Sequence, residues 1–284
     1  SEDSVMRKTI FITGATDGIG LLTAQKLIAG GHQVLLHGRH PDKLNRISAS
    51  LDGAPTYCAD LSVIDEVTSL SSAILAEYQQ LDVLINNAGV LKTADTKTKT
   101  GRDVRFEVNT LSPYILTQKL LNIIPKSGRI INLSSAAQAP VDIEAMMEYK
   151  VMDDMAAYAQ SKLAMTIWSA QLAATMPNGP ICVSVNPGSL LASKMVKEGF
   201  GIEGKDLNVG ADILVRAALS ADFSNASGMH FDNDRGEFAA PHQAANDGQH
   251  VEAVMAIISD ITQKFINEWR GYGSAGLIYI DDSS

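Results

Sequence analysis

Short apolar runs rich in β-branched residues alternate along this chain with longer stretches of helical periodicity. The runs that read as strands are Thr9–Thr13, Gln33–His37, Thr56–Ala59, Val83–Asn86, Arg129–Leu133 and Ile181–Asn186. The helical patterns between them are Ile19–Ala29, Leu61–Tyr78, Asp103–Ile124 and Tyr158–Met176. Because the strand runs are continuously apolar, we expect helices on both faces of a parallel sheet. The alternation therefore predicts an α/β protein with a doubly wound parallel sheet in three α/β/α layers.

The 284 residues contain no linker, composition shift or internal repeat, which favours a single Rossmann-type catalytic domain over residues 1–240. A helical pattern at His250–Trp269 and a glycine-rich end predict a C-terminal helical extension and tail at residues 241–284. The last apolar run, Leu277–Ile280, fits an added strand, an oligomer contact or a loose tail equally well.

Composition and charge exclude several classes of protein. With 45% hydrophobic residues and a net charge of -9, the chain is neither disordered nor suited to bind nucleic acid. Its uncharged stretch, Leu163–Ser193, is interrupted by prolines and glycines, so we expect no membrane span. Cys58 and Cys182 are predicted to be buried thiols in a reducing compartment. The six histidines lack metal-ligand spacing, so no metal site is expected, and a soluble cytoplasmic protein is the default interpretation.

A glycine-rich turn follows the first predicted strand and leads into the first predicted helix. Gly14 would permit the tight turn, Gly18 the close approach of a pyrophosphate, and Gly20 the packing of the helix on the sheet. The helix N-terminus would offer free N–H groups to the phosphates. A plain strand–helix turn is the alternative, but the position between strand and helix favours dinucleotide binding. The other residues of the turn that we expect at this site are Thr16, Asp17 and Ile19.

The end of the second predicted strand indicates which dinucleotide is bound. An acidic residue there would accept hydrogen bonds from the adenosine ribose of NAD. This chain has His37-Gly38-Arg39-His40 instead, and Arg39 can pair with a 2′-phosphate through two hydrogen bonds. We therefore expect NADP(H) as the cofactor, with a solvated surface arginine as the alternative. Asp17 is a mild counter-argument, because an acidic side chain adds nothing to phosphate attraction.

Tyr158 and Lys162 are four residues apart at the start of a helical pattern, so they share one helix face. A cation within about 4–6 Å lowers the pKa of a phenol by roughly 1–3 units, toward useful acid–base range. Such a pair alone is weak, because many helices contain one by chance. Three other predicted strands, however, end in polar or glycine-containing motifs: Asn86–Gly89, Ser134-Ser135 and Pro187-Gly188. These ends share the carboxyl edge of the sheet, where doubly wound folds bind ligands.

In this order and setting, the motifs make residues 8–235 resemble the compact, single-domain short-chain dehydrogenase/reductase family. Ser135 and Tyr158 are farther apart than is usual in that family. This longer spacing looks like the branch that holds retinol dehydrogenases and light-dependent protochlorophyllide reductases. The resemblance points to a bulky, apolar carbonyl or alcohol as the substrate.

The resemblance also implies roles for individual residues. Tyr158 would be the general acid or base, and Lys162 would bond the nicotinamide ribose and lower the pKa of Tyr158. Ser135, with Ser134 as the fallback, would orient the substrate carbonyl, and Asn109 would hold a water of the proton relay. The other cofactor-binding residues would be Asp60 and Leu61 beside the adenine, Asn87, Ala88 and Gly89 along the adenosine ribose, and Pro187 and Gly188 at the nicotinamide.

Two further segments are predicted to shape the substrate side. The inserted stretch Pro140–Met155 carries four methionines, which adapt to varied apolar ligands; a surface helix packed on the core is the alternative. Residues about 189–204 would form a mobile lid, as in the family, with a surface helix and loop as the alternative. In related proteins the Tyr158 helix often pairs with its symmetry mate, so a homodimer or homotetramer is expected.

These inferences predict an NADP(H)-dependent oxidoreductase that transfers a hydride between nicotinamide and a carbonyl or secondary alcohol. A non-enzymatic NADP(H)-binding redox sensor is one alternative, although a sensor would not need the proton relay of Tyr158 and Ser135. A sugar-nucleotide epimerase of the larger, related kind is a second alternative. It would need a sizeable C-terminal substrate domain, whereas 80 residues follow Gly204 here.

Overall fold

The computed structural model describes residues 6–189 and 206–272. Within these residues, eight strands form one sheet in the order β3-β2-β1-β4-β5-β6-β7-β8. Neighbouring strands are parallel except for β7 and β8, which are antiparallel. The strands are β1 (Thr9–Ile12), β2 (Gln33–Gly38), β3 (Thr56–Cys58), β4 (Val83–Asn86), β5 (Arg129–Leu133), β6 (Ile181–Asn186), β7 (His230–Asp232) and β8 (Glu237–Phe238). The order confirms the predicted doubly wound α/β fold and adds β7 and β8, which the sequence pattern did not indicate.

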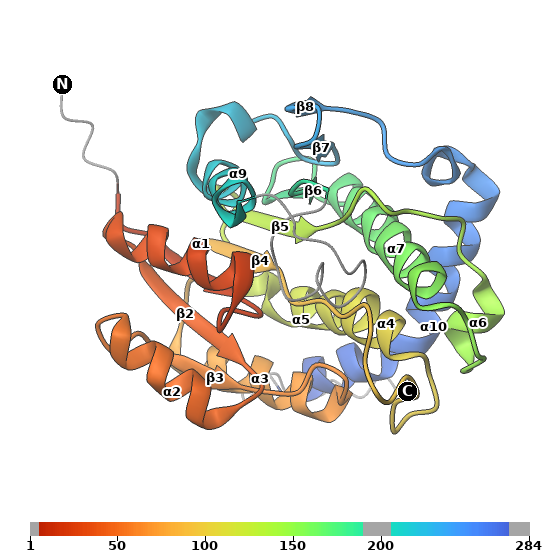
Figure 1. Ribbon diagram of the computed structural model, residues 1–284, viewed down its shortest axis with the longest axis horizontal. Helices are drawn as coiled ribbons and strands as arrows, with labels where there is room; N and C mark the ends of the chain where they lie inside the picture. Colours follow the sequence, from red (N-terminus) through yellow and green to blue (C-terminus); the bar gives the residue numbers. More distant parts are fainter. Residues whose placement is uncertain (1–5, 190–205, 273–284) are drawn as a thin grey trace, which may run out of the picture.

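Helices connect the strands and cover both faces of the sheet (Figure 1). They are α1 (Gly18–Ala29), α2 (Pro41–Ser50), α3 (Ile64–Glu77), α4 (Val104–Phe106), α5 (Ser112–Leu120), α6 (Ile143–Met147), α7 (Asp154–Ala174), α9 (Leu207–Leu219) and α10 (Gly248–Tyr272). A π-helical turn, Glu107–Leu111, joins α4 to α5. The helix predicted over Asp103–Ile124 is therefore three consecutive helical pieces, followed by a short 3₁₀ turn at Leu121–Ile123.

Side chains alternate between the two faces of β1, which explains why helices cover both. Ile10 and Ile12 pack in one apolar cluster with residues of α1 and α9. Phe11 packs on the opposite face in a second cluster, with residues of α3, α5, α7 and α10. Each fully buried side chain of this size stabilises the fold by about 1.5–3 kcal/mol. The two clusters together fix the sheet between its helical layers and hold the strand ends in register.

The C-terminal helix α10 packs against α5, α6 and α7. Val254 and Ile258 are fully buried there, in the same cluster as Leu163 of α7. Because α10 covers part of the helix that carries Tyr158, pairing with a second copy through that face would require α10 to move. The homo-oligomer stays a prediction, and Leu277–Ile280 lie outside the described residues.

Two sequence-based expectations about the strand ends are corrected. The helix predicted from Leu61 begins at Ile64, because the Asp60 carboxylate accepts hydrogen bonds from the backbone and hydroxyl of Ser62 and forms a turn first. Cys58 is exposed rather than buried, because it ends the edge strand β3, whereas Cys182 in β6 is buried as expected. Among the described residues, no helix combines the length and the apolar character needed to cross a bilayer.

Candidate active site

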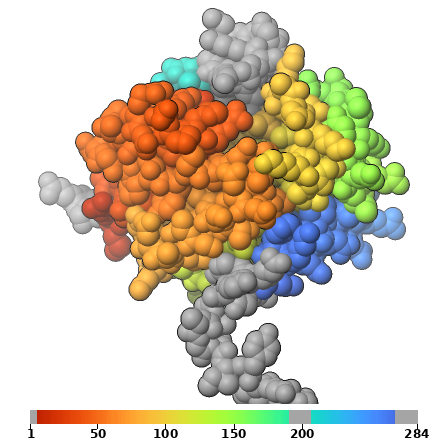
Figure 2. Space-filling view, turned by 90° about the horizontal axis from the view of Figure 1, so that it is seen from below, coloured from red at the N-terminus to blue at the C-terminus, as the bar shows by residue number. Residues whose placement is uncertain are grey.

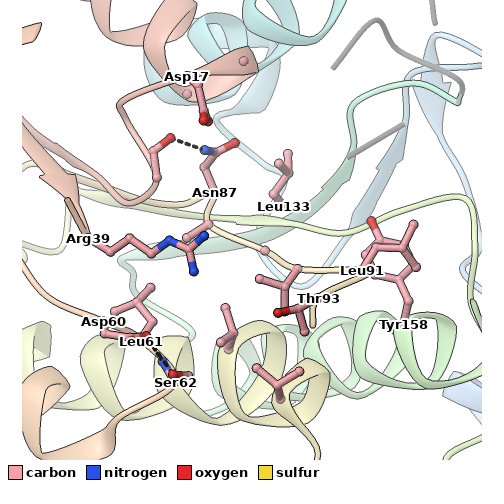
Figure 3. A pocket seen from close by; sticks show the side chains of 18 of the residues that line it. Asp17, Arg39, Asp60, Leu61, Ser62, Asn87, Leu91, Thr93, Leu133 and Tyr158 are labelled. Atoms are coloured by element: carbon pink, nitrogen blue, oxygen red, sulfur yellow. Dashed lines mark hydrogen bonds between the residues drawn. The ribbon is translucent and has the colours of Figure 1, made fainter. Parts of the chain in front are cut away.

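A cleft of about 900 Å³ lies at the carboxyl edge of the parallel strands. It collects residues from the ends of β1, β2, β3, β4, β5 and β6, together with Tyr158 and Lys162 of α7. In Figure 3, Arg39 and Asp60 lie on one side of the cleft and Tyr158 on the other. The predicted residues that line it are Gly14, Thr16, Asp17, Gly18, Ile19, Gly20, Arg39, Asp60, Leu61, Asn87, Ala88, Gly89, Ser135, Tyr158, Lys162, Pro187 and Gly188. Asn109 is the predicted residue that does not line it.

The glycines of the turn after β1 have distinct structural reasons. Gly14 and Gly18 have φ angles of 64° and 54°, in the left-handed region that side chains rarely adopt. A Cβ on Gly20 would lie 2.0 Å from the carbonyl oxygen of Gly14, so only glycine lets α1 pack this closely. A Cβ on Gly18 would meet no atom within 4 Å, because this position faces the cleft. The turn therefore leaves open space in front of the N-terminus of α1.

Asn87, directly after β4, fixes the glycine turn after β1 through hydrogen bonds. Its side-chain amide donates to the carbonyl oxygens of Thr13 and Gly14 at 3.0 and 3.1 Å. In return, the Thr13 hydroxyl accepts from the backbone N–H groups of Asn87 and Ala88, each at 3.0 Å. The ends of β1 and β4 are thus tied into one rigid floor, and Thr13 is a structural partner that sequence reasoning missed.

Charged side chains from the turn after β1 and from the ends of β2 and β3 also line the cleft. Arg39 is exposed and extends into the cleft (Figure 3). Asp17, which weighed against phosphate binding, lies 3.1 Å from the ammonium group of Lys43, so part of its charge is offset. Oδ1 of Asp60 accepts from Ser62, which sets the direction of that carboxyl group. These residues lie where a parallel sheet of this order would receive an adenosine.

Tyr158 and Lys162 lie on the first turns of α7 and are both buried. The Lys162 ammonium group donates to the carbonyl oxygen of Leu133 at 2.8 Å and lies 5.6 Å from the centre of the Tyr158 ring. Burial raises the pKa of Tyr158, and a hydrogen bond with Ser135 offsets part of this rise. Burial also lowers the pKa of Lys162 to about 8. A phenol, a hydroxyl and an ammonium group thus converge on one part of the cleft.

These pKa directions correct one expectation. Lys162 was expected to bring the pKa of Tyr158 below its ordinary value, but the pKa of the phenol is raised instead. The reason is that both groups are removed from water, and loss of hydration disfavours the charged form of each. Tyr158 is therefore held as the neutral phenol, the form that can donate a proton.

The two consecutive serines after β5 point to different places. The Ser134 hydroxyl is buried and lies 2.7 Å from the hydroxyl of Thr166 in α7. Ser135 is the one that bonds to Tyr158, and its hydroxyl also accepts from the backbone N–H of Ala137 at 3.1 Å. Ser134 thus ties β5 to α7, which leaves Ser135 as the hydroxyl beside the phenol.

Asn109 lies in the π-helical turn and is fully buried. Its amide donates to the carbonyl oxygen of Val90 and to the Ser161 hydroxyl, at 2.9 and 3.0 Å, and its oxygen accepts from the Val90 N–H at 2.8 Å. The side chain is thus engaged on both of its polar atoms. It joins the segment after β4 to α7, and π-helical turns of this kind are frequent at functional sites.

A buried ion-pair cluster supports the same region and was not anticipated. The guanidinium of Arg105 donates to Asp103 at 3.1 Å and to Asp154, the first residue of α7, at 2.7 Å. A longer contact of 3.4 Å reaches the carbonyl oxygen of Leu91, which lines the cleft. Acidic and basic residues at this spacing are common on solvated helices, so the sequence carries no signal that would have singled out Arg105.

No residue of the inserted stretch 140–155 lines the cleft, but the stretch contacts a loop that does. The Tyr149 hydroxyl lies 2.7 Å from the Thr96 hydroxyl, and the backbone N–H of Tyr149 donates to Gly101. The loop that contains Thr96 and Gly101 follows β4 and contributes Lys97 and Lys99 to the cleft wall. In Figure 2 this loop belongs to the yellow surface, which adjoins an orange surface.

The segment after β6 is fixed by the turn between β7 and β8. Asn186 donates to Asp232 and Asp234 at 3.1 and 3.0 Å, and the Ser189 N–H donates to Asp234 at 2.8 Å. Pro187 and Gly188 are thereby held at the cleft wall. Apart from Ser189, the predicted lid at 189–204 lies outside the described residues.

Comparison with known proteins shows the family to which this chain belongs. Residues 8–200 match the sequence profile of the short chain dehydrogenase family, so this chain belongs to that family. Retinol dehydrogenase 13 from Mus musculus is 29% identical over 267 residues, which cover 85% of this chain and 80% of the relative. The predicted resemblance to the retinol dehydrogenase branch is thereby confirmed.

Solved structures share the fold. A protein from Mycobacterium paratuberculosis matches with a TM-score of 0.76 and 23% identity, over 92% of this chain and 95% of the other. A short chain dehydrogenase from Shigella flexneri, complexed with NADP, matches with a TM-score of 0.65 and 25% identity, over 82% of this chain and 99% of the other.

Proposed function

We propose that this chain is an NADP(H)-dependent oxidoreductase that interconverts a bulky, apolar carbonyl compound and its alcohol. The observation that carries the proposal is the convergence of Tyr158, Ser135 and Lys162 in the same cleft as the glycine turn and Arg39. Membership of the short chain dehydrogenase family supports the reaction class. The NADP complex of the Shigella flexneri structure supports the cofactor.

The residues of the cleft fit a dinucleotide. The open space at Gly18 leaves room for a pyrophosphate where any Cβ would intrude, and the free N–H groups of the helix start would bind it, because α1 begins at this residue. Arg39 would pair with the 2′-phosphate, Asp60 would accept from the adenine, and Pro187 and Gly188 would flank the nicotinamide. When bound, the nicotinamide supplies or accepts the hydride.

The residues of α7 and β5 would handle the proton. In the reducing direction, neutral Tyr158 donates its proton to the carbonyl oxygen, while the Ser135 hydroxyl donates a hydrogen bond to the same oxygen. Both contacts strengthen as negative charge develops there, which lowers the barrier. Charged Lys162 then stabilises the phenolate that remains, and Asn109 positions α7 against the segment after β4. In the oxidising direction the same groups act in reverse.

Part of the cleft lining is apolar and includes Leu91, Val104, Leu133, Ala136 and Ala137, although the loop after β4 also contributes Lys97 and Lys99. Such walls favour a hydrophobic aldehyde, ketone or alcohol, and the retinol dehydrogenase relative is named for a substrate of that kind. The redox-sensor alternative has less support, because a sensor would not need a phenol and a serine hydroxyl bonded beside the cleft. The epimerase alternative is disfavoured by the family match.

A direct assay tests this proposal. The protein is mixed with NADPH and with straight-chain aldehydes of increasing length, retinal and small ketones, and the loss of NADPH absorbance is followed. We expect turnover to rise with the apolar length of the aldehyde. Absence of NADPH binding, or turnover confined to small charged carbonyl compounds, would refute the proposed substrate class.

Replacing Arg39 tests the cofactor preference. We expect Arg39→Leu to weaken NADPH binding about tenfold or more, because one charge-assisted phosphate pair contributes about 1.5–3 kcal/mol. NADH binding should stay unchanged, since NADH lacks the 2′-phosphate. Fluorescence titration of both cofactors measures this. Arg46→Leu, on the same segment but outside the cleft lining, is the matched control.

The lowered pKa of Lys162 predicts the pH profile. Below about pH 8 the side chain is a cation that can stabilise the phenolate, and above it the charge is lost. We therefore expect kcat/KM for NADPH, which reports on the enzyme before the cofactor binds, to fall above about pH 8. In Lys162→Arg this alkaline limb should disappear, because a guanidinium keeps its charge. An unchanged limb in the variant would assign it to another group.

A further inference from the structure

His37 occupies an unusual position for a histidine. It is the penultimate residue of β2, it is 3% exposed, and it borders the cleft. Its Nδ1 accepts a hydrogen bond from the backbone N–H of Gly14 at 2.9 Å. Its Nε2 lies 2.8 Å from the carbonyl oxygen of Ala59. A backbone N–H can only donate and a carbonyl can only accept, so the ring must be neutral, with its proton on Nε2.

The two bonds join three segments that the proposed function assigns to the dinucleotide. Gly14 opens the phosphate turn, Ala59 precedes Asp60 at the predicted adenine site, and His37 itself stands two residues before Arg39. The backbone adds a bond of its own, because Ala15 N–H donates to the carbonyl oxygen of His37 at 2.8 Å. One residue therefore sets the relative positions of the ends of β1, β2 and β3.

We propose that His37 is a positioning residue for the dinucleotide, and that only its neutral, Nε2-protonated form holds the phosphate turn in its binding geometry. The proposal rests on the function proposed above, because it assumes that the cleft takes a dinucleotide. The proposed role of His37 concerns the parts of the cofactor that NAD and NADP have in common. The proposed role of Arg39 concerns the 2′-phosphate, which only NADP carries.

Protonation of His37 would undo the arrangement. A second ring N–H would face the N–H of Gly14, so two donors would oppose each other and the bond would be lost. After β3, the carbonyl oxygen of Ala59 bonds Nε2 of the ring, and the carboxylate of Asp60 acts on the ring through its charge. From the turn after β1, the backbone N–H of Gly14 donates to Nδ1. Burial lowers the pKa of His37, and the bond to Ala59 and the charge of Asp60 raise it in part. The ring of His37 is therefore protonated only at a pH below the ordinary pKa of histidine.

Three substitutions separate the two bonds. His37→Asn keeps an acceptor at the Nδ1 position, within reach of Gly14, and His37→Gln keeps a donor at the Nε2 position, within reach of Ala59. His37→Leu removes both. We expect His37→Leu to raise the Kd of both NAD⁺ and NADP⁺ about tenfold or more. His37→Asn should retain more affinity than His37→Gln, because Gly14 begins the phosphate turn. Circular dichroism and thermal melting confirm that each variant is folded.

A pH titration tests the protonation step in the unaltered chain. NAD⁺ is the probe, because a phosphate monoester such as the 2′-phosphate of NADP⁺ itself titrates near pH 6. As the pH falls from about 7.5 to about 5, the Kd of NAD⁺ should rise by more than about twofold in the wild type, with the rise beginning below the ordinary pKa of histidine, and should stay within about twofold in His37→Asn.

The outcomes distinguish this inference from the proposed function. Failure of the wild type to bind either dinucleotide refutes both. Normal binding by the wild type, with an unchanged Kd in His37→Leu, overturns the role of His37 alone. Loss of NADP⁺ affinity without loss of NAD⁺ affinity in that variant also overturns it, because the effect would then act through Arg39. Should His37→Leu not fold, equal affinities in the Asn and Gln variants together with a flat wild-type pH profile would overturn it.

Discussion

Substitution Tyr158→Phe is expected to lower kcat by about 10²–10⁴-fold, the range that a positioned general acid or base contributes. The phenol is buried, kept neutral and hydrogen-bonded to Ser135, so its proton is the one available to a carbonyl oxygen in the cleft. The Kd of NADPH should change by less than about threefold, because the ring itself remains. Steady-state turnover and fluorescence titration of the same samples measure the two quantities.

The matched control is Tyr78→Phe, which removes a hydroxyl from a half-buried tyrosine outside the cleft. We expect it to leave both kcat and the Kd of NADPH unchanged. If Tyr158→Phe keeps more than about a tenth of the wild-type kcat, another group is the proton donor and the mechanism proposed here is wrong.

Substitution Gly20→Ala is expected to lower the free energy of unfolding by about 3 kcal/mol or more, at the upper end of the cost of overpacking. The added methyl group would lie 2.0 Å from the carbonyl oxygen of Gly14 and 2.4 Å from the side-chain nitrogen of Asn87. One contact is with backbone, and the other is with a side chain held by two hydrogen bonds, so neither can move cheaply. Denaturant unfolding measures the change.

Gly18→Ala is the comparison that separates packing from ligand binding. Its methyl group would meet no protein atom within 4 Å, and the cost to folding is the strain of a φ angle of 54°, about 1–2 kcal/mol. The methyl group would, however, project into the space proposed for the pyrophosphate. We expect a folded protein that binds NADPH at least about tenfold more weakly. Equal stabilities of the two variants would contradict the packing argument for Gly20.

The sequence predicted strands β1 to β6 well, because each is continuously apolar and ends at a turn motif. Some of the segments it missed have a structure that depends on distant contacts. β7 has three residues and exists because it pairs with β6, and its Phe231 packs against Phe223 and Phe238. α2 was missed for a different reason: Leu44 and Ile47 have helical spacing, but the segment is short and mostly polar.

The candidate site was predictable where residue type and place in the fold suffice. The glycine turn, Tyr158, Lys162 and Ser135 are of this kind, and the structure brings them to one cleft. Their supporting residues were not predictable. His37 acts through backbone N–H and carbonyl groups, which leave no mark on the sequence, and Arg105 pairs with carboxylates that only the fold brings together. The direction of the Tyr158 pKa shift was missed for a related reason, since the degree of burial depends on the whole fold.

The orientation of the cofactor is the central claim, and a crystal structure of the chain with NADP⁺ tests it most directly. The account predicts that the nicotinamide lies between Tyr158 and Gly188, with the pyrophosphate at the start of α1 and the 2′-phosphate on Arg39. A dinucleotide that lies in the reverse direction, or binds away from the cleft at saturating concentration, would contradict it.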